Sequence, residues 1–112
     1  MNKKLITAVM IVGLSFSSMA KEYKIGVLAK RGAAKTLKKW KTTGDYLTNK
    51  IAGDTFTIVP LKFDDVNPYI ENNKVDFFLV NSSMFITAKV KYGASEVATI
   101  LNATNRQNRF TF

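Results

Sequence analysis

Short apolar runs alternate with longer amphipathic segments along the chain. Runs at residues 22–28, 55–61 and 75–80 are too short for buried helices and rich in β-branched and aromatic residues, so each is expected to be a strand. A fourth strand is expected at 96–101, and a truncated one at 109–112. The apolar density of 75–80 indicates a strand covered on both faces, as in a parallel sheet. This alternation predicts an α/β fold with an open, mostly parallel sheet and flanking helices.

The segment between the first two strands has the spacing of an amphipathic helix. Together with Gly44, the apolar residues Leu37, Trp40, Leu47 and Ile51 recur at intervals of three and four, so they are expected to face the core. Core packing is therefore the first expectation for Trp40. Glycine inside a helix costs about 1 kcal/mol relative to alanine. We expect Gly44 to lie where the helix backbone passes close to the sheet.

Two further helices are predicted. After the second strand, Asp64, Asp65 or Asn67 can cap a short helix that has Pro68 in its first turn. After the third strand, a helix is expected over residues 83–92.

The polar turn Asn81-Ser82-Ser83 follows the third strand and precedes this last helix. Free backbone N–H groups and the positive end of the helix dipole favour an anion or a polar ligand group at such a position. The alternative is that Ser82 or Ser83 only caps its own helix.

Ligands of open α/β sheets sit beyond the carboxyl ends of the strands. That rule brings together three predicted loops, at residues 29–33, 63–65 and 81–83. No glycine-rich phosphate motif is present, which argues against a dinucleotide-binding or P-loop fold.

The chain contains no cysteine and no histidine. Disulfides and thiolate chemistry are therefore excluded, and the commonest general base and metal ligand are missing. Asp64 and Asp65 have no base or nucleophile beside them in the sequence, so helix capping is expected of them before catalysis. We expect a protein that is not an enzyme, with no catalytic residues, no metal and no cofactor.

The net charge is +9, and seven positive residues lie between Lys24 and Lys41. Three interpretations are open: the solvated face of a helix, a field that attracts anionic ligands, and a nucleic-acid surface. No groove-reading motif is visible, so nucleic acid is not the expected partner.

Residues 1–20 have the pattern of a signal peptide. Lys3 and Lys4 precede an apolar stretch from Leu5 to Leu14, and small residues at 18–20 fit a cleavage site. The stretch is short for a membrane span, which needs about 20 residues. Export to the periplasm or another extracytoplasmic space is expected, with an uncleaved anchor as the alternative. The folded part would then be residues 21–112.

Several segments resemble one family in their order and spacing. They are Ile25–Gly32, Trp40, Tyr46–Thr48, Phe56–Leu61, Val75–Phe77 and Asn81–Ser83. The pattern resembles the type 2 periplasmic binding proteins of the phosphate/phosphonate-binding group, in the version that forms the extracytoplasmic sensor region of bacterial sensor histidine kinases. The resemblance covers residues 23–101.

The resemblance implies two α/β lobes with a ligand held between them, of which this chain matches the first lobe only. A second lobe, a membrane helix and a kinase would lie outside the chain. The implied ligand contacts come from the three loops at the sheet edge. These residues are Lys30, Arg31, Gly32, Asp64, Asn81, Ser82 and Ser83. The planar guanidinium of Arg31 suits an anionic ligand.

Three functions remain open from the sequence. The first is the extracytoplasmic ligand-binding lobe of a two-component sensor kinase, with a small anionic solute as its ligand. The second is the substrate-binding protein of an ABC importer for phosphonate, phosphate-like or sulfur oxyanions, which would dock on an ABC permease. The third is a small basic surface or nucleic-acid-binding protein.

Overall fold

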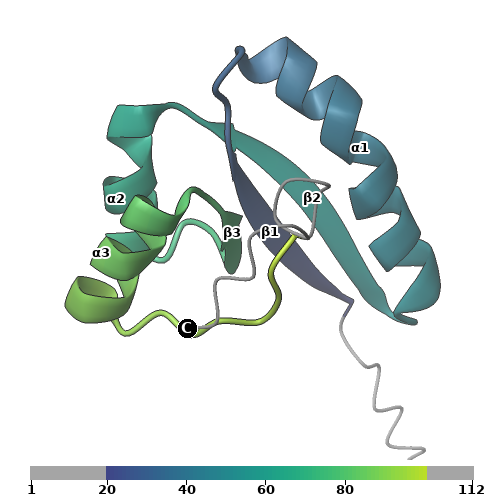
Figure 1. The fold of residues 1–112 in the computed structure, drawn as a ribbon. Coiled ribbons are helices and arrows are strands. Elements are labelled where there is room, and N and C mark those ends of the chain that lie inside the picture. The colour runs from purple at the N-terminus through teal and green to yellow at the C-terminus, as the bar shows by residue number, and fades with distance from the viewer. Residues whose placement is uncertain (1–19, 101–112) are drawn as a thin grey trace, which may run out of the picture.

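A computed structural model describes residues 20–100, in which strands and helices alternate along the chain (Figure 1). The elements are β1 (Lys21–Leu28), α1 (Ala33–Lys50), β2 (Asp54–Leu61), α2 (Phe63–Glu71), β3 (Phe77–Leu79) and α3 (Ser82–Tyr92). The predicted signal peptide and the predicted strand at 109–112 lie outside the described residues.

The three strands form a parallel sheet in the order β2-β1-β3. Leu28 at the end of β1 pairs with Leu61 at the end of β2, and Val27 pairs with Leu79 at the end of β3. The carboxyl ends of the strands therefore meet at one edge of the sheet. Helix α1 lies against β2, whereas α2 and α3 lie together on the other side of the sheet (Figure 1). The predicted α/β fold with a parallel sheet and flanking helices is confirmed.

The hydrophobic core lies between the sheet and the pair α2 and α3. Leu61 and Val66 are almost fully buried, and Ala88 of α3 is fully buried against them. Gly26 of β1 leaves room for the Leu61 side chain, because a Cβ atom at Gly26 would lie 2.7 Å from Cδ1 of Leu61. The core is small, so each of its side chains contributes a large share of the stability.

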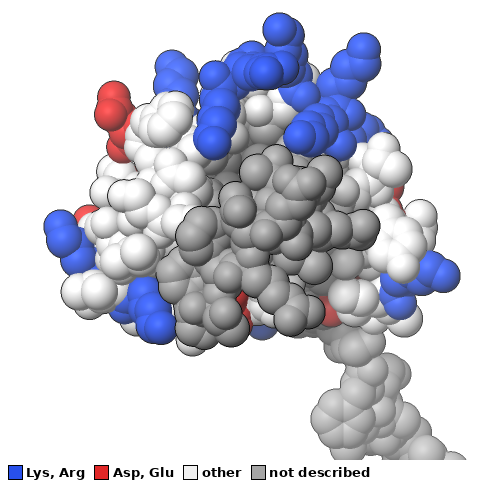
Figure 2. All heavy atoms as spheres, viewed as in Figure 1, with Lys and Arg blue, Asp and Glu red and all other residues white. Residues whose placement is uncertain are grey.

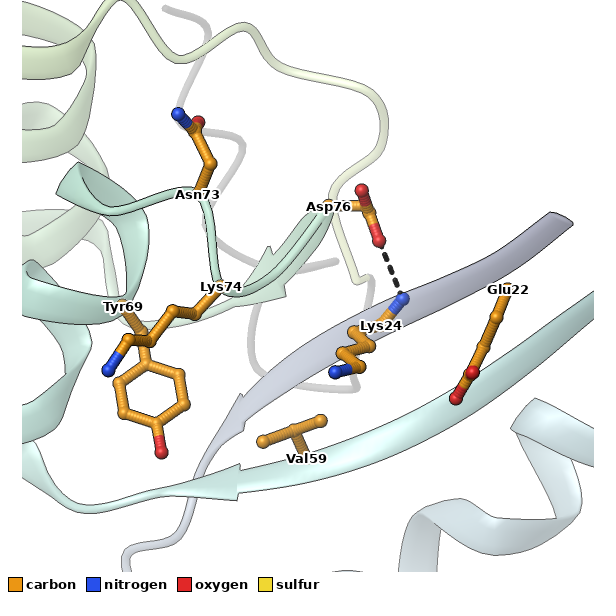
Figure 3. A pocket seen from close by; sticks show the side chains of 7 residues that line it. All are labelled: Glu22, Lys24, Val59, Tyr69, Asn73, Lys74 and Asp76. Atoms are coloured by element: carbon orange, nitrogen blue, oxygen red, sulfur yellow. Dashed lines mark hydrogen bonds between the residues drawn. The ribbon is translucent and has the colours of Figure 1, made fainter.

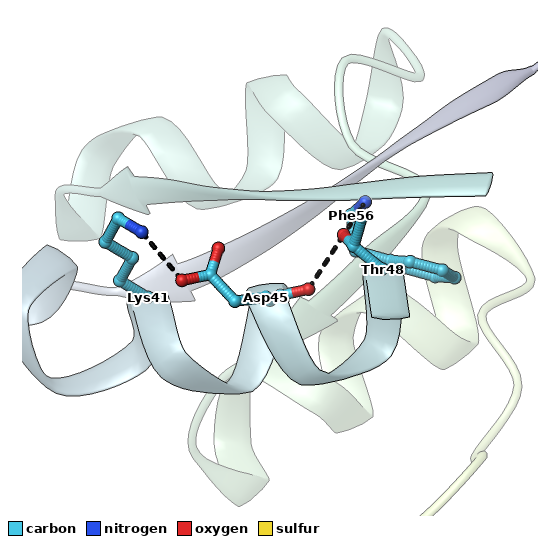
Figure 4. Close-up of polar contacts among 5 residues, drawn as sticks. Lys41, Asp45, Thr48 and Phe56 are labelled. Carbon is cyan, nitrogen blue, oxygen red and sulfur yellow. Dashed lines mark hydrogen bonds and ion pairs between the residues drawn. The ribbon is translucent and has the colours of Figure 1, made fainter. Parts of the chain in front are cut away.

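Helix α1 contacts β2 through Gly44, as the sequence predicted. A Cβ atom at this position would lie 3.1 Å from the carbonyl oxygen of Phe56. One turn later, the Thr48 hydroxyl donates to the Gly44 carbonyl and accepts from the Phe56 N–H, both at 2.9 Å (Figure 4). The Phe56 N–H of this edge strand is thereby paired with the helix. The ion pair between Lys41 and Asp45 is exposed and contributes little to stability.

The predicted apolar stripe of α1 is only partly buried, which corrects the expectation from its spacing. Leu37 and Ile51 are 42% and 41% exposed, and Trp40 and Leu47 are half-buried. The reason is that α1 packs along β2, the outer strand, through a narrow contact at Gly44.

The prediction of two-sided coverage for residues 75–80 is wrong. Strand β3 has only three residues and a single neighbour, β1, among the described residues, and Phe77 is 40% exposed. Asp76 does not join the strand. Its N–H donates to the Lys24 carbonyl at 2.9 Å, and its carboxylate accepts from the Lys24 N–H at 2.8 Å. At the start of β3, the Asp76 carboxylate thus accepts a hydrogen bond from the Lys24 N–H in place of a backbone carbonyl.

Two smaller predictions also need correction. Residues 96–100 form no strand, and Leu101 lies outside the described residues. Helix α2 begins at Phe63 after Lys62, which makes no side-chain cap. The predicted caps Asp64 and Asp65 instead occupy its first turn, where the helix dipole favours negative charge. Because the helix starts early, Pro68 lies in its interior.

Candidate functional site

The turn after β1 and the first half of α1 enclose a hollow of about 470 Å³, here called the cationic hollow. It is lined by Leu28, Lys30, Arg31, Lys35, Thr36, Lys39 and Trp40. Four of these side chains are positive, and no acidic residue of the described chain joins them. Figure 2 shows Lys and Arg side chains gathered at the top of the molecule, over this turn and the start of α1. The hollow therefore concentrates positive charge at the carboxyl end of the central strand.

The local sequence explains how the hollow is built. Gly32 has φ +94, a conformation that glycine adopts easily, and it serves as the N-cap of α1. Its carbonyl accepts from the N–H of Thr36 at 3.2 Å and from the Thr36 hydroxyl at 2.9 Å, which fixes this buried side chain. Lys35 and Lys39 are one turn apart, as are Thr36 and Trp40, so each pair lies on one side of the helix.

The electrostatics of the hollow favour an anion for two reasons. Helix α1 has no acidic residue in its first turn and no side-chain cap, so the positive end of its dipole faces no negative side chain of its own. In addition, no carboxylate among residues 20–100 lies within ion-pair distance of Lys30, Arg31, Lys35 or Lys39, since the ion pair of the described chain joins Lys41 to Asp45. An anion in the hollow would therefore meet cations that have no carboxylate partner in the described chain, close to the positive end of the α1 dipole.

The structure brings only part of the predicted site together. Lys30 and Arg31 line the cationic hollow, and Gly32 stands beside it as the N-cap of α1. Asp64 lies at the same edge of the sheet, exposed in the first turn of α2, and does not line the hollow. The turn at residues 81–83, from which α3 begins, also lies at this edge and does not line the hollow.

The cap of α3 is Asn81, which corrects the expectation that Ser82 or Ser83 would cap this helix. Its side-chain oxygen accepts from the Met84 N–H at 2.9 Å, while Ser82 and Ser83 are exposed in the first turn of α3. A ligand contact for these three residues remains a prediction.

The cap can be tested by replacing Asn81 with alanine. Because a helix N–H loses its partner, we expect the free energy of unfolding to fall by about 1 kcal/mol in urea denaturation. Ser82→Ala is the control, since this exposed neighbour makes no cap and should change stability by less than about 0.5 kcal/mol. Equal losses from both variants would show that Asn81 is not the cap.

Of the four cations that line the hollow, sequence reasoning singled out Lys30 and Arg31 as site residues. Lys35 and Lys39 belonged to the charge cluster for which a solvated helix face was one interpretation, and Trp40 was expected in the core. The structure places all three around the hollow, with the Lys39 ammonium 5.5 Å from the centre of the Trp40 ring. The four-residue spacing of Lys35 and Lys39, close behind Lys30 and Arg31, was the available signal.

A second hollow of about 480 Å³ lies at the opposite end of the sheet, beyond the C-terminus of α2 (Figure 3). It is lined by Glu22, Lys24, Val59, Tyr69, Asn73, Lys74 and Asp76. Its two positive and two negative side chains give it no net attraction for an anion. The Lys74 ammonium lies over the Tyr69 ring, 5.2 Å from its centre. The cationic hollow is therefore the stronger candidate site.

Between residues 20 and 100, no three His, Cys, Asp or Glu side chains come together in a way that could hold a metal ion. No helix in this range combines the length and the apolar character needed to cross a membrane.

Comparison with known proteins gives one informative match. The chain is 30% identical over 73 residues to the tetrathionate sensor histidine kinase TtrS of Salmonella typhimurium. The chain is similar to part of a sensor histidine kinase. The match covers 65% of this chain but only 12% of the kinase. No family profile and no solved structure matches the chain.

Proposed function

We propose that this chain is the ligand-binding lobe of an extracytoplasmic sensor and that it recognises a small anionic solute. The observation that carries the proposal is the cationic hollow, where Lys30, Arg31, Lys35 and Lys39 lie beside the first turns of α1 without carboxylate partners in the described chain. The similarity to part of a sensor histidine kinase supports the sensor role.

Sulfur oxyanions are the first ligands to test. The name of the similar kinase refers to tetrathionate, a dianion with a negative group at each end of a sulfur chain. A dianion suits a hollow with several separate cations, because each charged group can form charge-assisted hydrogen bonds with its own partners. The guanidinium of Arg31 presents a planar pair of donors to such a group.

The proposed mechanism is closure of two lobes around the ligand. In the full protein, a second lobe would cover the cationic hollow, and closure would pass a signal through a membrane helix to a kinase. This chain would contribute binding and no catalysis, in keeping with the lack of histidine and cysteine.

An importer receptor is the second candidate, because the family resemblance of the sequence fits soluble binding proteins as well as sensors. Such a protein would deliver phosphonate, phosphate-like or sulfur oxyanions to an ABC permease. The gene distinguishes the two functions. A second lobe followed by a membrane helix and a kinase indicates a sensor, and a second lobe followed by a stop codon indicates an importer receptor.

Anion binding can be tested by replacing Arg31 with glutamine. We expect the affinity of the chain for tetrathionate, measured by isothermal titration calorimetry at low salt, to fall about tenfold, because a charge-assisted hydrogen bond contributes roughly 1.5–3 kcal/mol.

The matched control is Lys89→Gln, which removes the same charge from the last turn of α3. We expect less than a twofold change from it. An equal loss in both variants would mean that only net charge matters. Strongly salt-dependent binding to DNA, with no binding of small anions, would instead favour a nucleic-acid-binding protein.

A further inference from the structure

Trp40 stands apart from the hydrophobic core. The core cluster is formed by residues of the sheet, α2 and α3, and Trp40 belongs neither to this cluster nor to the side chains packed against it. The indole is half-buried and, with Leu28, gives the cationic hollow an apolar wall. This wall faces the same space as the four cations.

Charge alone does not explain an apolar wall in an anion site. The face of an indole ring carries partial negative charge, so it does not attract an anionic group. It does attract a cation, and the Lys39 ammonium lies 5.5 Å from the ring centre. The negative groups of a ligand should therefore contact the lysines and Arg31, and an uncharged part of the ligand should contact Trp40.

The size of the hollow agrees with a ligand larger than a single oxyanion. At about 470 Å³ it falls within the range of roughly 300–1,000 Å³ that is typical of small-molecule sites. One tetrahedral ion would leave most of this volume to water. A longer ligand can reach from the turn at Lys30 and Arg31 to Trp40, which lies two helical turns into α1.

We infer that Trp40 is a ligand-contacting residue that selects elongated dianions, whose charged ends are separated by an uncharged, polarisable body. This inference rests on the proposed function and names the ligand class of the same site. Organic disulfonates and polythionates belong to this class, whereas sulfate and phosphate do not. The cations supply affinity for charge, and Trp40 supplies the preference for a body between the charges.

The experiment uses the 112-residue chain, whose single tryptophan makes its fluorescence specific for Trp40. Tetrathionate and sulfate, both dianions, are titrated at equal ionic strength, with affinity measured by calorimetry. We expect tetrathionate to shift or quench the Trp40 emission and sulfate to leave it unchanged. Trp40→Ala should weaken tetrathionate binding about tenfold and sulfate binding less than twofold, whereas Trp40→Phe should keep most of the affinity.

Leu37→Ala is the control, because Leu37 lies on the same helix, is 42% exposed and does not line the hollow. Far-ultraviolet circular dichroism verifies that each variant is folded. If Trp40→Ala and Leu37→Ala bind tetrathionate as the unchanged chain does, while Arg31→Gln binds it more weakly, the inference on Trp40 is wrong and the anion site stands. If the unchanged chain binds neither anion, the proposed function itself fails.

Discussion

Replacing Leu61 with alanine is expected to lower the free energy of unfolding by about 3 kcal/mol. Leu61 is 1% exposed at the end of β2, between Val66 of α2 and the backbone of Gly26. The substitution removes apolar contacts and leaves a cavity that the surrounding backbone cannot fill. Because small domains are stable by only about 5–15 kcal/mol, this loss should be plain in urea denaturation.

The control for Leu61 is the same substitution at Leu37, which is 42% exposed. We expect Leu37→Ala to cost less than about 1 kcal/mol, because a large part of the side chain already meets water and less apolar surface is lost than at Leu61. If the two variants lost equal stability, the core would not lie between the sheet and the pair α2 and α3.

Replacing Gly44 with valine should lower the free energy of unfolding by about 2 kcal/mol, even though valine is the better helix former. A Cβ atom would lie 3.1 Å from the Phe56 carbonyl oxygen and 3.4 Å from Cγ1 of Ile58, and valine adds two further methyl groups. To make room, α1 must move away from β2, which also disturbs the hydrogen bond from the Phe56 N–H to Thr48. Urea denaturation followed by circular dichroism measures the loss.

Thr42→Val is the matched control for Gly44→Val, because it places the same side chain on the exposed face of α1. Threonine and valine have similar helix propensities, so its effect should stay within about 0.5 kcal/mol. A neutral or stabilising Gly44→Val variant would show that α1 does not approach β2 closely.

Local patterns were sufficient to predict most of the fold. The short apolar runs marked β1 and β2 to within a residue or two, and the helical spacing marked α1. The close contact at Gly44 was predictable, because a glycine lowers helix stability and its lack of a side chain is useful where two backbones come close. The edge position of β2 also agrees with Pro60, which cannot donate a ladder hydrogen bond.

The failures concern features that depend on distant parts of the chain. An apolar run such as 75–80 has the same composition whether both faces of its strand are covered or, as in β3, one of its side chains, Phe77, stays 40% exposed. Residues 96–100 have a strand-like composition, but the described structure gives them no strand to pair with. Strand formation needs a partner, and periodicity carries no information about partners.

The candidate site was predicted in part for the same reason. The strand-end rule located Lys30 and Arg31, because it depends only on strand direction. Trp40 was placed in the core because an apolar stripe does not reveal which of its residues face a hollow at the edge of the sheet. The cap of α3 was expected at Ser82 or Ser83, because serine and asparagine are both preferred N-caps and the sequence does not show which of the three begins the helix.

Because the strands end close together, the buried scaffold of this chain lies on one side of their ends and the variable turns lie on the other. The strands of the described structure finish within one residue of one another, since Leu28 pairs with Leu61 and Val27 pairs with Leu79, and much of the turns that follow is exposed. Apart from Gly32, whose φ is +94, and Asn81, which caps α3, mutations at the exposed positions of those turns can accumulate with little effect on folding. During evolution, such a lobe could acquire a new specificity by exchanging its turns while its scaffold stays the same.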